Sequence, residues 1–124
     1  MEEVSGVMVV NNGKCLVCKR SKDTTFPNTW ALPMGHAEKG ETPIETAKRE
    51  FKEEMGIDIV GDLEMIGKID YVTVFKIVKG KKIVPDLKNA KDGYEHSQCM
   101  YGNKEIIKNL NMENGLKNII LKNL

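Results

Sequence analysis

The sequence predicts a single α/β domain in which helices cover a mixed β-sheet. Its 124 residues are close to the commonest domain length, so we expect one domain with one core over residues 1–124. Segments rich in β-branched residues alternate with helix-forming segments in the order β-rich, helix, β-rich, helix. Hydrophobic residues make up 40% of the chain and charged residues 30%, the ordinary balance of a water-soluble domain.

The chain opens with a predicted β-hairpin. Residues 4–10 are rich in Val and residues 15–19 form the returning strand, while Asn-Asn-Gly-Lys at 11–14 is a hairpin turn signal. Residues 21–29 are polar and predict a loop. Trp-Ala-Leu-Pro at 30–33 predicts a short extended segment that leads into a loop rich in glycine and charge.

The clearest predicted element is a helix over residues 43–55. Thr42 is a good N-cap, Pro43 fits the first helical position, and Glu45 completes a capping box. Gly56 is a typical C-terminal stop. The residues that follow helical spacing and predict its apolar face are Ile44, Ala47, Phe51 and Met55.

The second half of the chain predicts short strands followed by two helices. We expect strands at residues 57–60, 63–78 (one or two strands), 83–84 and 97–101, a turn at 79–82, a mobile loop at 86–96, and helices at 103–110 and 114–124. The last helix has an apolar face formed by Leu116, Ile119, Ile120 and Leu124. That face either covers the chain's own core or joins a second copy, so a homodimer stays open.

The charge balance excludes some classes of partner. The formal net charge is +1, so no broad positive field favours nucleic acid or an anionic membrane. No apolar run approaches the roughly 20 residues that a membrane span needs. Residues 1–4 carry no basic leader, so we expect a cytoplasmic protein with a small-molecule partner.

The three cysteines predict reduced thiols. Cys15 and Cys18 form a C-x-x-C pair, but both lie on a predicted strand, where residues three apart point to opposite faces. The sequence has no second Cys or His pair at zinc-ligand spacing. Reduced thiols agree with the expected cytoplasmic location.

Three glutamates crowd one face of the predicted helix. Glu50, Glu53 and Glu54 are related by i, i+3 and i+4, and like charges at that spacing repel by about 0.2–0.5 kcal/mol. A divalent cation such as Mg²⁺, which prefers oxygen ligands, would relieve this repulsion. An ordinary solvated helix face, with Arg49 and Glu53 as an i, i+4 ion pair, is the alternative. The helix alone leaves both interpretations open.

The segment 35–57 fits, without a gap, the pattern G-x5-E-x7-R-E-U-x-E-E-x-G-U, in which U is a large apolar residue. The residues at its fixed positions are Gly35, Glu41, Arg49, Glu50, Glu53, Glu54 and Gly56. This pattern is the Nudix box, and the sequence resembles compact, MutT-like members of the Nudix hydrolase family. The preceding Asn-Thr-Trp-Ala-Leu-Pro-Met-Gly is similar to the family's lead-in, with Met34 in place of the first of two glycines.

The resemblance implies an α/β/α sandwich with a mixed sheet and a loop–helix–loop catalytic motif. It also implies a pyrophosphohydrolase that uses Mg²⁺ or Mn²⁺ to cleave a nucleoside diphosphate linked to another group. The implied metal ligands are Glu50, Glu53, Glu54 and the carbonyl oxygen of Gly35. Arg49 would pair with Glu41 or with a metal-binding glutamate and orient the cluster.

Other site residues are expected outside the box. One of the glutamates Glu50, Glu53 and Glu54, or a later acid, would activate the attacking water; Glu95 is the first later choice, and Asp92 the second. The alternative for Glu95 is an acid on a surface loop. Arg20 and Lys19, at the end of the second strand, are candidates for phosphate contact, or simply a solvated strand end. His96 is expected to be a surface or packing residue.

The resemblance implies the type of reaction but leaves several classes of substrate open. We expect a nucleoside triphosphate, including oxidised forms, to be cleaved to a monophosphate and pyrophosphate. The alternatives are ADP-ribose or another nucleotide sugar, a dinucleoside polyphosphate, an RNA 5′ end, and a non-catalytic nucleotide-binding domain. Side chains considered for stacking on a base are Phe26, Trp30, Tyr94 and Tyr101, with Tyr71 as a weak hint of a dinucleoside polyphosphate.

Overall fold

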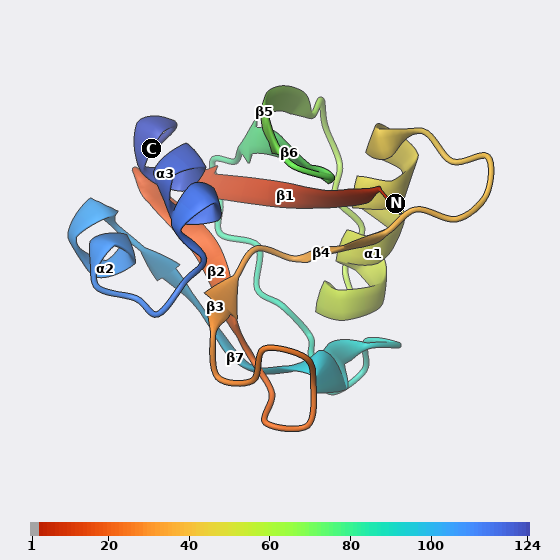
Figure 1. Ribbon diagram of the computed structural model, residues 1–124, viewed down its shortest axis with the longest axis horizontal. Coiled ribbons are helices and arrows are strands. Elements are labelled where there is room, and N and C mark those ends of the chain that lie inside the picture. Colours follow the sequence, from red (N-terminus) through yellow and green to blue (C-terminus); the bar gives the residue numbers. More distant parts are fainter. Residues whose placement is uncertain (1–2) are drawn as a thin grey trace.

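A computed structural model describes residues 3–124 and shows a mixed sheet with helices beside it (Figure 1). Met1 and Glu2, which belong to the expected domain and the predicted leader-free start, lie outside the described residues. The strands are β1 (Val4–Asn11), β2 (Lys14–Arg20), β3 (Trp30–Ala31), β4 (Met34–His36), β5 (Glu64–Ile69), β6 (Val72–Val78) and β7 (His96–Gly102). The helices are α1 (Pro43–Met55), the 3-10 helix η1 (Gly93–Glu95), α2 (Lys104–Lys108) and α3 (Asn114–Lys122).

The strand β1 is the centre of the sheet. The main strand order is β3-β2-β1-β6-β5, with β4 paired to β1 and β7 paired to β2. β1 runs parallel to β6 and antiparallel to β2, so the sheet is mixed, as expected. The antiparallel pair β5–β6 shows that residues 63–78 form two strands.

Alternate residues of β1 enter two separate cores. Val7 and Val9 pack in one cluster with Phe51 and Met55 of α1. Met8 and Val10, on the opposite face, pack in the other cluster, whose helical members include Leu116 and Ile120 of α3. Because neighbouring strand residues point to opposite faces, β1 links the two layers of an α/β/α sandwich. The apolar face of α3 therefore covers the chain's own sheet.

The helix α1 begins and ends where the sequence predicts. The Thr42 hydroxyl accepts a hydrogen bond from the Glu45 amide, and the Glu45 carboxylate accepts one from the Thr42 amide. Gly56 ends the helix with φ of 75°, a left-handed conformation that favours glycine.

The inward face of α1 differs from the prediction. Ile44 is 41% exposed, whereas Thr46 is buried and its hydroxyl donates to Glu41 and to the Thr42 carbonyl. The buried set is Thr46, Ala47, Phe51, Glu54 and Met55. The helix is thus turned so that a satisfied hydroxyl replaces Ile44 and one glutamate enters the interior.

Two predicted strands are wrong. Residues 57–60 form no strand, although Ile59 is buried in the first core, because burial of one side chain needs no strand partner. Residues 83–84 also form no strand. The Tyr101 hydroxyl donates to the Ile83 carbonyl and accepts from the Ile83 amide, so a side chain satisfies the backbone that a strand partner would satisfy.

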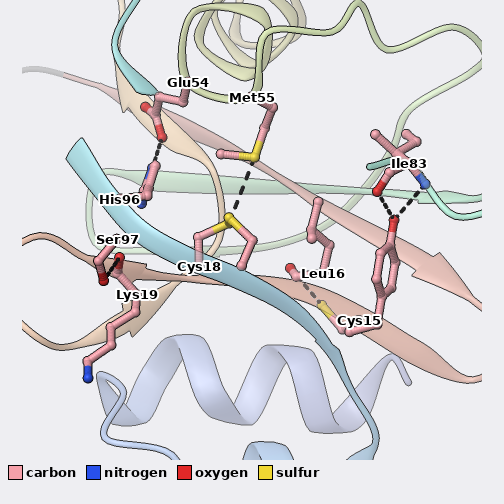
Figure 2. The surroundings of a disulfide bond; sticks show 11 residues. Cys15, Leu16, Cys18, Lys19, Glu54, Met55, Ile83, His96 and Ser97 are labelled. Atoms are coloured by element: carbon pink, nitrogen blue, oxygen red, sulfur yellow. Dashed lines mark hydrogen bonds and ion pairs between the residues drawn. A yellow bond between two sulfur atoms is a disulfide. The ribbon is translucent and has the colours of Figure 1, made fainter. Parts of the chain in front are cut away.

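The expectation that all cysteines are reduced is also wrong, because Cys18 and Cys99 form a disulfide between β2 and β7 (Figure 2). The two strands are antiparallel, and their register sets Cys18 opposite Cys99. Cys15 is the free cysteine among residues 3–124; it lies in the other core, and burial raises the pKa of its thiol to about 12. No helix within residues 3–124 is long and apolar enough to cross a membrane.

Candidate active site

The guanidinium group of Arg49 bonds to three carboxylates of the box, those of Glu41, Glu50 and Glu53. Arg49 Nε and Nη2 donate to the two carboxylate oxygens of Glu41, at 2.7 and 3.0 Å. Arg49 Nη1 donates to Glu50 Oε1 and to Glu53 Oε1, both at 2.9 Å, and Nη2 also donates to the His36 carbonyl at 2.8 Å. The hydrogen bond from Arg49 is the largest cause that lowers the pKa of Glu41, to about 2. Arg49 thus joins the loop before α1 to two acids on α1.

The strand β4 runs next to α1 (Figure 1), and its Gly35 lies against Glu50 of that helix. A side-chain carbon at Gly35 would overlap the carboxyl group of Glu50. Only glycine lets the backbone of β4 approach this carboxylate so closely. Glycine is therefore needed at position 35 for a steric reason, which the sequence pattern alone does not reveal.

Glu54 is buried, whereas Glu50 and Glu53 on the same helix are only partly buried. Its side chain is 2% exposed, and its Oε1 lies 2.7 Å from Nε2 of His96 (Figure 2). Burial, the charges of Glu50 and Glu95, and a hydrogen bond with Glu50 raise the pKa of Glu54 to about 10, while the Met34 backbone opposes the shift. Burial also lowers the pKa of His96, to about 4. Both shifts favour uncharged groups in the buried pair.

A cavity of about 780 Å³ begins at these acids and continues to an apolar wall. The acidic end includes Gly35, Glu50, Glu54, Asp92 and Glu95, with Arg20 beside it. The apolar wall includes Phe26, Trp30, Met34, Tyr71 and Leu116. A volume of this size suits a small-molecule ligand.

Not every predicted site residue lines the cavity. Arg20 does, held by a 2.6 Å hydrogen bond from its Nε to the Thr25 carbonyl. Lys19, its neighbour on β2, is outside the lining, and its side chain points away from the Glu54–His96 pair in Figure 2. Glu53 is also outside the lining and lies between Arg49 and Lys91, whose Nζ is 3.5 Å from Glu53 Oε2.

Comparison with known families decides the relationship. The model of the NUDIX domain matches residues 2–106, most of the chain. The chain belongs to the Nudix family. The Nudix box of the sequence therefore marks the α1 region described above, and the family resemblance predicted from residues 35–57 is confirmed.

Relatives with curated names match part of the chain. Nucleoside triphosphatase NudI of Enterobacter sp. (strain 638) is 46% identical over 50 residues, which are 40% of this Nudix chain and 36% of that protein. The m7GpppN-mRNA hydrolase NUDT17 of Xenopus laevis is 47% identical over 47 residues, 37% of this chain and 16% of that protein. The chain thus spans about a third or less of the curated relatives it matches.

Solved structures match nearly the whole Nudix fold. DR0079 from Deinococcus radiodurans has a TM-score of 0.77 at 16% identity and covers 98% of this chain and 82% of its own. A MutT protein from Methanosarcina mazei Go1 has a TM-score of 0.69 at 25% identity and covers 98% and 91%. The predicted α/β fold class is thereby confirmed.

The Nudix site has the donor chemistry of a hard divalent cation. Burial, and after it the charges of Glu50 and Glu95, raise the pKa of Glu54; burial, and after it the charge of Asp92, raises the pKa of Glu95. Negative charge is therefore concentrated at the acidic end. Oxygen donors of this kind suit Mg²⁺ or Mn²⁺. Across residues 3–124, no three Asp, Glu, His or Cys side chains stand as a ready metal-binding group. Arg49 contacts Glu50 and Glu53, and His96 contacts Glu54. The residues fit the ion if these carboxylates turn toward it.

Some of the residues singled out from the sequence line the cavity, and others do not. Glu95 and Asp92 both line the cavity, on or next to η1. Tyr94 is largely exposed and Tyr101 bonds to Ile83, and neither is in the cavity lining. His96 was expected at the surface or in packing, yet it contacts Glu54. No local signal reveals this pairing, because it depends on where β7 begins relative to α1.

The buried Glu54 predicts a pH-dependent stability of the metal-free protein. Its folded pKa, about 10, lies above the ordinary value of 4.5, so its contribution to stability is full below about pH 4.5 and is lost as pH rises toward 10. His96, whose pKa is lowered from 6.5, acts in the opposite direction only at lower pH. We therefore expect the free energy of unfolding to fall between about pH 7 and pH 9. Urea denaturation with a chelator measures it, and Glu54→Gln should flatten the slope; an unchanged slope would contradict the assignment.

Proposed function

We propose that this Nudix chain hydrolyses a phosphoanhydride bond of a nucleotide in a metal-dependent reaction. The first-choice substrate is a nucleoside triphosphate, oxidised forms included, which is cleaved to a monophosphate and pyrophosphate. One observation carries the proposal: a single cavity joins the acidic end at Glu50 and Glu54 to the aromatic wall at Trp30 and Phe26. A nucleotide has the matching polarity, with an apolar base at one end and phosphates at the other.

The two ends of the cavity would divide the substrate between them. Phe26, Trp30 and Tyr71 offer aromatic surface to a base. Arg20, the cation of the lining, would contact the phosphates near the acidic end. Lys19 stays a prediction as a phosphate contact, but its position outside the lining gives it less support than Arg20.

The residues that would hold Mg²⁺ or Mn²⁺ are Glu50, Glu53, Glu54 and the carbonyl group of Gly35. Such an ion, when bound, neutralises phosphate charge and lowers the pKa of a bound water. Arg49 would keep Glu50 and Glu53 together while Glu41 fixes the guanidinium from the other side. This arrangement favours preorganised electrostatic stabilisation of the reacting phosphate.

Glu95 is the proposed general base, and its replacement by Gln should lower kcat by about 10²–10⁴-fold. Burial and the charge of Asp92 raise the pKa of Glu95, so it takes up a proton more readily than an exposed acid. Steady-state kinetics across pH measure the loss, and the acidic limb of the profile should change. Glu64→Gln, on the exposed part of β5, is the matched control. A fall in kcat of less than about threefold would exclude Glu95 as the base.

A dinucleoside polyphosphate is the second candidate substrate, because Tyr71 is 41% exposed and also lines the cavity. An exposed ring at the cavity wall can stack on a second base. A nucleotide sugar, a capped RNA and a non-catalytic role complete the alternatives. The complete set of box glutamates favours an enzyme over a binding module.

A substrate panel with product analysis tests the proposed function. The purified chain with Mg²⁺ or Mn²⁺ is incubated with nucleoside triphosphates, oxidised forms, nucleotide sugars, dinucleoside polyphosphates and capped RNA. Pyrophosphate and a monophosphate from a triphosphate are the expected products. Binding of nucleotides without turnover of any of them would overturn the hydrolase proposal and favour a binding module.

We also propose a cytoplasmic location and a homodimer. The Cys18–Cys99 disulfide gives the location a test, because such bonds are rare in cytosolic proteins outside hyperthermophiles. Thiol titration of protein taken directly from cells, with alkylation at lysis, should find Cys18 and Cys99 reduced if the compartment is reducing. Light scattering of the purified chain measures the oligomeric state.

A further inference from the structure

His96 reaches across the interior from β7 to a glutamate on α1. Its Nε2 lies 2.7 Å from Glu54 Oε1, and the two side chains are 1% and 2% exposed (Figure 2). The other ring nitrogen, Nδ1, is buried and has no hydrogen-bond partner within residues 3–124. The polar contact of this ring is therefore directed to Glu54.

Backbone hydrogen bonds fix the segment that carries His96. The Asp92 amide donates to the Glu53 carbonyl at 2.7 Å, and the Asp86 amide donates to the Met55 carbonyl at 2.8 Å. On the other side, the Ser21 amide donates to the Glu95 carbonyl at 2.8 Å. The start of β7 is thus tied to the last turn of α1 and to the end of β2. These ties set the distance between His96 and Glu54 without help from their side chains.

The fold does not need an ionisable pair at this position. Glu54 is flanked on α1 by Glu53 and Met55, and Met55 packs in the apolar core with Phe51 and Cys18. A buried pair of ionisable groups costs desolvation energy, and two apolar side chains of similar volume often stabilise a protein as well or better. A structural role alone therefore explains the pair poorly, whereas the position of Glu54 in the cavity lining gives the pair a reason.

We infer that His96 is a positioning residue that holds the Glu54 carboxylate in place as a metal ligand. The inference rests on the proposed metal-dependent function. With Oε1 engaged by His96, Oε2 would be the oxygen of Glu54 that meets a cation. A ligand fixed by a hydrogen bond from a second element loses less conformational freedom when the metal binds. His96 thus acts on the cation through Glu54 and does not touch it.

Two amide variants separate a positioning role from a packing role. His96→Gln carries an amide nitrogen at about the reach of Nε2, whereas His96→Asn is too short to contact Glu54. Both are neutral and polar, so their effects on the surrounding core are similar. Removal of such an outer partner typically weakens metal binding by about 10–100-fold. We expect that loss of Mn²⁺ affinity in His96→Asn, and His96→Gln should stay within about threefold of the unmodified chain.

Mn²⁺ affinity of the full chain is measured by titration calorimetry and by the Mn²⁺ electron paramagnetic resonance signal, without substrate. Gln98→Asn is the control, because it removes from an exposed residue of β7 the one methylene by which Gln and Asn at position 96 differ. It should leave the Mn²⁺ affinity unchanged. Equal Mn²⁺ affinity in His96→Asn, His96→Gln and the unmodified chain would overturn the inference alone. Failure of the unmodified chain to bind Mn²⁺ would overturn the metal-dependent function, and the inference with it. In kinetic measurements, His96→Asn should need a higher Mn²⁺ concentration for half-maximal rate, while its KM for the nucleotide stays unchanged.

Discussion

Replacing Glu50 by Gln is expected to lower kcat/KM by at least about 100-fold while the fold stays intact. Glu50 lines the cavity, lies against the backbone of Gly35 and accepts a hydrogen bond from Arg49. Gln keeps the shape and an acceptor for Arg49 but removes the negative charge that a divalent cation needs. Loss of a carboxylate that acts as general acid or base typically costs about 10²–10⁴-fold, and we expect loss of a metal-binding carboxylate to fall in the same range. Hydrolysis of the best substrate from the panel, at saturating Mg²⁺, measures it.

The control for this prediction is Glu64→Gln, which makes the same chemical change on an exposed residue of β5 outside the cavity lining. Its activity and its thermal unfolding should match those of the unmodified chain. Glu50→Gln should also unfold near the same temperature, because the amide still accepts from Arg49. If Glu50→Gln kept more than a tenth of the activity, the acidic end of the cavity would not be where the chemistry occurs.

The parts of the fold that depend on local signals could be predicted from the sequence. The hairpin at 11–14 and the helix over 43–55 follow from turn residues and from a capping box, which act within a few residues. The false strands at 57–60 and 83–84 show the limit of such signals. A short apolar stretch has the same pattern whether it pairs with a neighbour or only buries one side chain such as Ile59.

The residues of the site also fall into those that local signals predict and those that tertiary packing determines. The acids of one helix could be selected together because their spacing is fixed by the helix, and Glu41 could be added because the family pattern fixes its distance. The partner His96 and the Cys18–Cys99 bond could not, because each joins strands or helices whose register is set by tertiary packing. The burial of Glu54 escaped prediction for a related reason: the helix is turned by the inward position of Thr46.

Arg49 explains how the acids of α1 coexist when no cation is bound. Glu50 and Glu53 each accept from the same Nη1, and Glu41 occupies the other edge of the guanidinium. Such a planar fork meets several carboxylates at fixed angles, which a lysine ammonium group on a flexible stem cannot do. The positive charge of Arg49 thereby offsets the repulsion between the glutamates that the sequence places on one face of α1. Glu54 lacks this contact, and the structure buries it beside His96 instead.

Arg49→Lys is therefore expected to lower kcat/KM by about 10–100-fold although the charge is conserved. Loss of the fork leaves partly buried carboxylate oxygens without donors, at a cost of about 1–3 kcal/mol in the free energy of unfolding. The pKa of Glu41 should rise from about 2 toward its ordinary value, since the hydrogen bond from Arg49 is the largest cause of its depression. In the unmodified chain, the stabilisation from Glu41 is present above about pH 4.5 and is lost as pH falls toward 2. Kinetics, urea denaturation and an NMR titration of Glu41 measure the three effects.

Lys48→Arg is the matched control, because it makes the reverse exchange on the exposed side of the same helix. It should change neither the activity nor the pKa of Glu41. Arg49→Lys keeps the positive charge but removes the planar guanidinium group, so it separates the effect of charge from that of geometry. If Arg49→Lys kept full activity and a depressed Glu41 pKa, a single positive charge would suffice to hold the cluster, and the fork geometry would have no role. If the pKa of Glu41 rose while activity stayed constant, the hydrogen bonds of Arg49 would stabilise the fold only. The acids of α1 would then reach their catalytic positions without them.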